Sequence, residues 1–193
     1  MPNWVSNSLF ITGETASDID EVVAQLTRPI PQKVEGKIVF EPTEFSFWNV
    51  IAPEREKWDD YFSIADGTEP RDNWYNWNIN NWGAKWDAND TYIERADTNL
   101  SISFETAWSP VEPVVVRLSL QFRHLHFSYS YEEEQGWGGE VEYEAGEASE
   151  RKEWDIPNSH KEYEERDRLD SCVCAWDENR EDWYEDCPKG GAE

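Results

Sequence analysis

Three segments in the second half of the chain alternate between apolar and polar residues. Residues 99–105 place Leu100, Ile102 and Phe104 on one side and small polar or acidic residues on the other. Residues 125–131 and 137–144 repeat this alternation, with acidic side chains on the polar side of the last segment. A period of two is typical of a strand that is buried on one face. Each segment is therefore predicted to be a half-buried strand, and Gly138 and Gly139 indicate a bulge or a close approach within the last one.

A strand and a helix are predicted near the start of the chain. Residues 7–12 contain a short apolar run closed by Gly13, which predicts a strand that ends in a turn. Ser17 is expected to cap a helix with acidic residues in its first turn. Pro29 and Pro31 should end this helix. Its apolar stripe consists of Ile19, Val22, Val23 and Leu26.

Other segments leave the secondary structure open. Residues 37–40 are a candidate short strand, and the charged residues 158–170 are a candidate helix. For residues 110–122 the local signals conflict. Ser109 followed by Pro110 favours a helix start, whereas the β-branched residues 114–116 favour a strand.

The charge of the chain excludes some partners. The sequence has 42 acidic and 17 basic residues, a net charge of −25, and residues 131–193 carry −15 of it. Direct binding of nucleic acid or an anionic membrane requires Lys and Arg, so a basic protein partner is favoured instead. The 12 Trp, 8 Tyr and 8 Phe residues predict a folded domain rather than a disordered acidic chain. With neither a signal-peptide pattern nor a long apolar run, the protein is expected in the cytoplasm, away from membranes.

Catalytic and metal-binding patterns are not found. The sequence contains none of the common hydrolase, nucleotide-binding or zinc-protease motifs, so no enzymatic activity and no cofactor are expected. Cys172, Cys174, Cys187 and His160 could supply four ligands, but their spacing fits no standard zinc site. They are interpreted as residues of a reduced, metal-free protein.

Residues 73–88 combine four Trp residues, several Asn residues and Lys85. A helix followed by a loop around Gly83 is predicted for this segment. Indole rings and Asn amides suit flat, hydrogen-bonding ligands such as bases. The same side chains could instead close the core, because indole N–H groups and amides can satisfy buried backbone groups. The sequence leaves both interpretations open.

Four blocks resemble the phage and plasmid proteins with a YubB-type ferredoxin-like domain. They are residues 2–7 (PNWVSN), 80–86 (NNWGAKW), 104–110 (FETAWSP) and 131–133 (YEE). The resemblance covers about residues 1–146 and implies an α+β fold with a ferredoxin-like β-α-β-β-α-β core. It makes residues 110–122 the second helix and implies an origin in bacterial mobile elements. The expected organisation is a domain of residues 1–146 with an aromatic-rich insertion at about 32–90, followed by an acidic C-terminal extension of residues 147–193.

Two functions are compatible with these features. The first is a non-enzymatic counter-defence protein with an acidic, DNA-mimicking surface, which inhibits a bacterial defence protein at its basic nucleic-acid-binding surface. The expected contact residues are Glu132, Glu133, Glu134, Glu140, Glu142, Glu144, Glu164, Glu165, Asp167 and Asp182. The alternative is a sponge that sequesters a nucleotide immune signal. Its expected ligand-binding residues are Trp74, Trp77, Asn78, Asn81, Trp82, Lys85 and Trp86.

Overall fold

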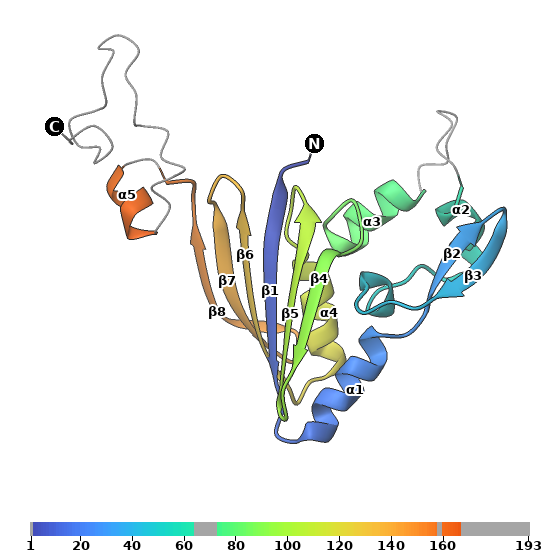
Figure 1. Cartoon of the computed structure of the whole chain (residues 1–193), viewed down its shortest axis with the longest axis horizontal. Coiled ribbons are helices and arrows are strands. Elements are labelled where there is room, and N and C mark those ends of the chain that lie inside the picture. The colour runs from blue at the N-terminus through green and yellow to red at the C-terminus, as the bar shows by residue number, and fades with distance from the viewer. Residues whose placement is uncertain (1, 64–72, 158–159, 167–193) are drawn as a thin grey trace, which may run out of the picture. The chain divides into compact units, whose positions relative to one another are not determined.

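The computed structural model describes residues 2–63, 73–157 and 160–166. These residues fall into two compact units, of which the first covers residues 1–134 and 138–153. Its centre is a six-stranded sheet with the order β4-β5-β1-β6-β7-β8 (Figure 1). The second unit covers residues 135–137 and 154–193.

The core of the first unit is ferredoxin-like, as expected. Along the chain it consists of β1 (Trp4–Thr12), α1 (Ala16–Leu26), β4 (Asn89–Arg95), β5 (Asn99–Ala107), α4 (Glu112–Gln121) and β6 (His126–Glu133). Strand β1 lies in the centre and pairs antiparallel with both β5 and β6. The strands predicted from alternation are confirmed as β5, β6 and the following β7 (Gly138–Glu144).

One further strand extends this sheet. Strand β8 (Glu147–Trp154) is the sixth strand, and β7 lies between it and β6. The boundary expected at residue 146 therefore lies later, because most of β8 belongs to the first unit. Gly139 is a site of close approach, since a Cβ there would lie 2.7 Å from the Tyr131 hydroxyl and 3.2 Å from the Lys152 carbonyl.

Helices α1 and α4 cover one face of the sheet (Figure 1). Helix α1 buries Ile19, Val22 and Leu26, as its apolar stripe predicts. Its N-cap is Thr15 rather than Ser17. The Thr15 hydroxyl accepts from the Asp18 N–H, and the Asp18 carboxylate accepts from the Thr15 N–H in a capping box.

Residues 112–121 form a helix, which settles the conflict between cap and β-propensity. The β-branched Val114 and Val115 are buried on the sheet, so tertiary packing outweighs their preference for strand. The predicted cap is wrong: the N-cap residue is Val111. Ser109 instead donates its hydroxyl to the Gly83 carbonyl at 2.5 Å, a contact with a distant segment that local sequence cannot indicate.

The insertion between α1 and β4 holds small elements. They are β2 (Ile30–Val34) and β3 (Lys37–Glu41), which form a separate two-stranded sheet, and then η1 (Phe47–Asn49), η2 (Arg55–Lys57), α2 (Trp58–Tyr61) and α3 (Trp74–Trp82). The helix and loop predicted around Gly83 are confirmed, because Gly83 ends α3 with a left-handed φ of 86°. The strand predicted at 37–40 is β3.

Buried polar groups connect the central strands to the start of α4. The Tyr129 hydroxyl donates to Asn7 Oδ1 at 2.5 Å and accepts from the Val111 N–H at 3.0 Å. The Asn7 amide donates to Thr106 Oγ1 at 2.9 Å, and the Thr106 hydroxyl donates to the Ser109 carbonyl at 2.7 Å. Since these groups are buried, each depends on its partner for a hydrogen bond.

The described part of the second unit is small. It contains α5 (His160–Glu165), which falls within the helix expected at 158–170, and the rest of that segment lies outside the described residues. The Arg166 guanidinium donates to the carbonyls of Gly136 and Asp155, and it lies 5.8 Å from the Trp154 ring centroid. Tyr163 is buried. No helix in the described ranges combines the length and apolar character needed to cross a membrane.

Replacement of Tyr129 by Phe should lower the free energy of unfolding by about 1–3 kcal/mol, because Asn7 Oδ1 and the Val111 N–H both lose a buried partner. Urea unfolding measures this loss. The matched control is Tyr92→Phe, at a ring that is 64% exposed, where a change below about 0.5 kcal/mol is expected. Equal midpoints for the two variants would contradict the structural role of the Tyr129 hydroxyl.

Candidate functional site

The face of the sheet opposite α1 and α4 is polar, and we call it the open face. Its centre is a row of serines in register: Ser8 lies opposite Ser103 on one side and Ser130 on the other. Glu140 of β7 continues this row beyond Ser130. In the neighbouring row, Phe10 projects from the same face and is 43% exposed.

Four of the predicted acidic contact residues lie on the open face, namely Glu132 on β6 and Glu140, Glu142 and Glu144 on β7. Their side chains point to the same side of the sheet as the serines, because the register places them at equivalent strand positions. His126 pairs with Glu142 at 2.8 Å and Glu144 at 3.4 Å, and Lys152 lies 3.9 Å from Glu140. Glu105 joins the acidic group, because Glu105 and Glu132 flank Ser6 in one row.

The other predicted acidic contacts are not among the strand residues that form this face. Glu133 is 2% exposed and accepts from the Asn3 amide at 2.6 Å, so its prediction as a surface contact is wrong. The reason is strand parity, since neighbouring residues point to opposite faces. Glu134 follows β6 in the turn, and Glu165 is exposed on α5 in the second unit. The Glu164 side chain, Asp167 and Asp182 lie outside the described part of the structure.

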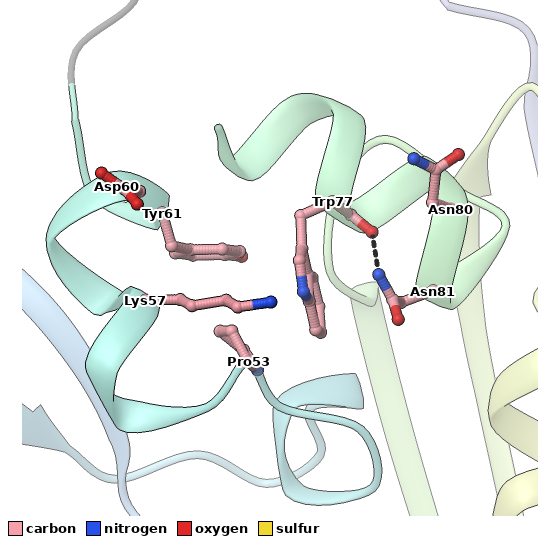
Figure 2. A pocket seen from close by; sticks show the side chains of 7 residues that line it. All are labelled: Pro53, Lys57, Asp60, Tyr61, Trp77, Asn80 and Asn81. Carbon is pink, nitrogen blue, oxygen red and sulfur yellow. Dashed lines mark hydrogen bonds between the residues drawn. The ribbon is translucent and has the colours of Figure 1, made fainter. Parts of the chain in front are cut away.

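A pocket lies between the short helices of the insertion and α3, and we call it the aromatic pocket (Figure 2). It has a volume of about 320 Å³. The Lys57 side chain extends between Tyr61 and Pro53 toward Trp77 (Figure 2). The Trp77 and Tyr61 rings meet edge to face with centroids 5.6 Å apart. Its lining consists of Pro53, Lys57, Asp60, Tyr61, Trp77, Asn80 and Asn81.

The predicted ligand residues divide between this pocket, the core and another surface. Trp77 and Asn81 line the pocket, and the Asn81 amide donates to the Trp77 carbonyl at 2.8 Å. Trp82 and Asn78 are buried, so for these two residues the interpretation as core closure is confirmed and the prediction as ligand contacts is wrong. The Trp82 indole donates to the Ile51 carbonyl, and the Asn78 amide connects the Tyr61 hydroxyl to the Lys85 carbonyl.

Lys85 and Trp86 lie in a second aromatic group. The Lys85 ammonium is 4.5 Å from the Trp86 ring centroid, 5.1 Å from Trp108 and 5.5 Å from Tyr75. Trp74 lies beside this group, with its ring 5.8 Å from Tyr75. Tyr75 and Trp108 are not among the residues predicted to bind a ligand. Tyr75 lies within residues 73–88, the aromatic segment noted in the sequence, and Trp108 lies in one of the four blocks that carry the family resemblance.

Two carboxylates, Asp87 and the half-buried Glu112, have structural roles. Burial raises the pKa of the Asp87 carboxyl, while hydrogen bonds from Ser46, the Phe47 N–H and the Ala88 N–H act in the opposite direction. The Arg151 guanidinium lowers the pKa of Glu112 by hydrogen bonding, with both nitrogens at 2.6–2.9 Å. Within the described residues no group of three or more His, Cys, Asp or Glu side chains is arranged to hold a metal ion.

Comparison with known proteins supports the fold. A protein-family model described as the ferredoxin-like domain in Api92-like proteins matches residues 81–172. The crystal structure of protein api92 from Yersinia pseudotuberculosis is similar, with a TM-score of 0.54 and 11% sequence identity. This similarity covers 82% of the present chain and 100% of that chain. No curated protein matches the sequence.

Replacement of Glu112 by Gln should destabilise the protein at neutral pH by up to about 1 kcal/mol, since the pair with Arg151 is partly exposed. The lowered pKa favours ionised Glu112 in the folded state. Its contribution is therefore complete above the unfolded pKa of about 4.3 and is lost as the pH falls through the lower folded value. Urea unfolding at pH 7, 5, 4 and 3 should show the wild type and the variant converging.

The matched control for this pH dependence is Glu21→Gln, at an exposed position on α1. It should follow the wild type at every pH. A stability difference between Glu112→Gln and the wild type that stays constant from pH 7 to pH 3 would contradict the role of the ionised carboxylate.

Proposed function

We propose that the protein binds a basic protein partner through the acidic residues of the open face. In the specific form we favour, it is a non-enzymatic counter-defence protein of a bacterial phage or plasmid, acting in the host cytoplasm. Its partner is then a defence protein that handles nucleic acid, and the open face occupies that protein's nucleic-acid-binding surface.

The observation that carries this proposal is the arrangement of carboxylates on β7 and β6. Glu140, Glu142 and Glu144 alternate along one strand, so successive carboxylates are about 7 Å apart. Glu132 and Glu105 add two further carboxylates on neighbouring strands. A regular row of anionic groups on a sheet is complementary to cationic side chains that otherwise contact phosphates.

The row of serines leaves the centre of the open face accessible to a partner. Ser8, Ser103 and Ser130 are short, so a partner can approach the sheet closely over its central strands. The net charge of −25 adds long-range attraction to a basic partner and raises the rate of encounter. The same negative charge opposes direct binding of nucleic acid.

Neutralising the open face should weaken partner binding by about tenfold or more, because four carboxylates that we propose contact the partner are lost. The variant combines Glu132→Gln, Glu140→Gln, Glu142→Gln and Glu144→Gln. Tagged wild type and variant are used to capture the partner from a lysate of defence-carrying bacteria. Recovery with the wild type should also fall when duplex DNA or salt is added.

A second quadruple variant provides the matched control for charge. It combines Glu21→Gln, Glu41→Gln, Glu54→Gln and Glu56→Gln, all at exposed positions away from the open face. Net charge then changes equally in both variants. If both lose the partner to the same degree, total charge rather than the open face is responsible, and the proposal fails.

The aromatic pocket favours a second candidate, the sequestration of a nucleotide signal. Its volume of about 320 Å³ lies at the lower end of the range for small-molecule sites. Trp77 and Tyr61 offer ring surfaces, Lys57 offers a cation and Asn81 offers an amide. Together these groups can hold a base and a phosphate, although the charge of the whole chain opposes anions.

This candidate predicts that a nucleotide remains bound to the purified protein in native mass spectrometry. Lys57→Met should reduce the bound fraction about fivefold, because one cation is removed from the pocket. Lys37→Met on β3 is the matched control and should retain the wild-type fraction. A wild-type protein without bound nucleotide, or an unchanged fraction in Lys57→Met, would rule out this second candidate.

A further inference from the structure

Three exposed rings surround the Lys85 ammonium, and we call this group the Lys85 cluster. Tyr75 is 40% exposed, Trp86 38% and Trp108 48%. The Trp86 and Trp108 centroids are 5.7 Å apart, and Trp4 extends the group with its ring 6.2 Å from Trp86. Large exposed rings are uncommon on the surface of a folded monomer, and in groups they mark binding sites.

The backbone at Trp108 is held in an unfavourable conformation. Its φ of 66° lies in the left-handed region, which a bulky residue rarely adopts. The conformation is maintained by the Trp108 N–H, which donates to the Asn3 carbonyl at 2.9 Å, and by the hydrogen bond between Thr106 and Ser109 that spans it. The fold thus maintains strain at a residue whose ring is half exposed, as is typical of functional positions.

Contacts of both the backbone and the side chain hold Lys85 in place. Its carbonyl accepts from the buried Asn78 amide at 2.8 Å, and its ammonium lies over the three rings. Among the described residues no carboxylate lies within salt-bridge distance of this ammonium, in a chain with 42 acidic residues. The cluster therefore combines exposed aromatic surface with a localised cation that has no anionic partner among residues 2–63, 73–157 and 160–166.

We propose that the Lys85 cluster binds a planar anion: an aromatic ring system that stacks on Trp86 or Trp108 and carries a negative group that pairs with Lys85 Nζ. Stacking on indole rings tolerates many planar ring systems, while the cation selects those with a nearby negative charge. A nucleotide and an aromatic carboxylate share this chemistry. Tyr75, Lys85, Trp86 and Trp108 lie outside the strands of the sheet and do not line the aromatic pocket, so the site can be tested apart from the proposed function.

The test is an NMR titration that follows the indole N–H signals of the full-length protein. Adenosine 5′-monophosphate supplies ring and anion, adenosine the ring, and inorganic phosphate the anion. The nucleotide should shift the Trp86 and Trp108 signals saturably and bind at least about fivefold more tightly than adenosine. 2-Naphthoate, titrated in parallel, distinguishes the two sources: the tighter of the two probes identifies a nucleotide or a carboxylate.

Two variants test the assigned roles. Lys85→Met keeps the aliphatic stem and should lower the affinity for the nucleotide to that for adenosine, whereas the matched Lys37→Met should leave it unchanged. Trp108→Ala should weaken the binding of both adenosine 5′-monophosphate and adenosine about tenfold, because stacking on the indole ring is lost. The proposal is overturned if no saturable shift occurs, if the shifts appear at Trp77 of the aromatic pocket instead, if phosphate alone produces them, or if Lys85→Met binds like the wild type.

Discussion

The hydrogen bond from the Tyr129 hydroxyl to Asn7 is the interaction on which both faces of the sheet depend, the helix-covered face and the open face. It joins the two central strands from inside the core, and through the Val111 N–H it fixes the start of α4. Asn7 also holds Thr106, which in turn holds the turn at Ser109. Burial makes these contacts obligatory, because an unpaired donor or acceptor in the core costs about 1–3 kcal/mol. The serines beside Asn7 on the same strand point to the opposite face, so one strand serves both the buried network and the open face.

The four sequence blocks that suggested a ferredoxin-like domain meet around this network. Asn3 of the first block accepts from the Trp108 N–H and donates to Glu133, which belong to the third and fourth blocks. Gly83 of the second block accepts from Ser109 of the third. The blocks therefore describe one connected region in space, and three of their four Trp residues, Trp4, Trp86 and Trp108, gather near Lys85.

The local sequence predicted the alternating strands correctly, but it assigned wrong roles to several side chains. Period-two alternation identified β5, β6 and β7 because each is buried on one side only. Alternation also determines that Glu133 points inward, although acidic composition alone suggested a surface role. Ser109 looked like a helix cap, but its hydroxyl bonds to Gly83, and Asn78 and Trp82 looked like ligand contacts but satisfy buried backbone groups. In each case a partner distant in the chain decided the role. The charged β8 lacks alternation and became visible as a strand only through its pairing with β7.

The open face is the surface that we propose contacts a basic partner. The most direct measurement is carbodiimide cross-linking of the protein to the captured partner, followed by mass spectrometry, since this reagent joins carboxylates to contacting amines without a spacer. We expect links from Glu132, Glu140, Glu142 or Glu144 to lysines at the nucleic-acid-binding surface of the partner. Links confined to acidic residues elsewhere in the chain, with none from these four, would contradict this proposal.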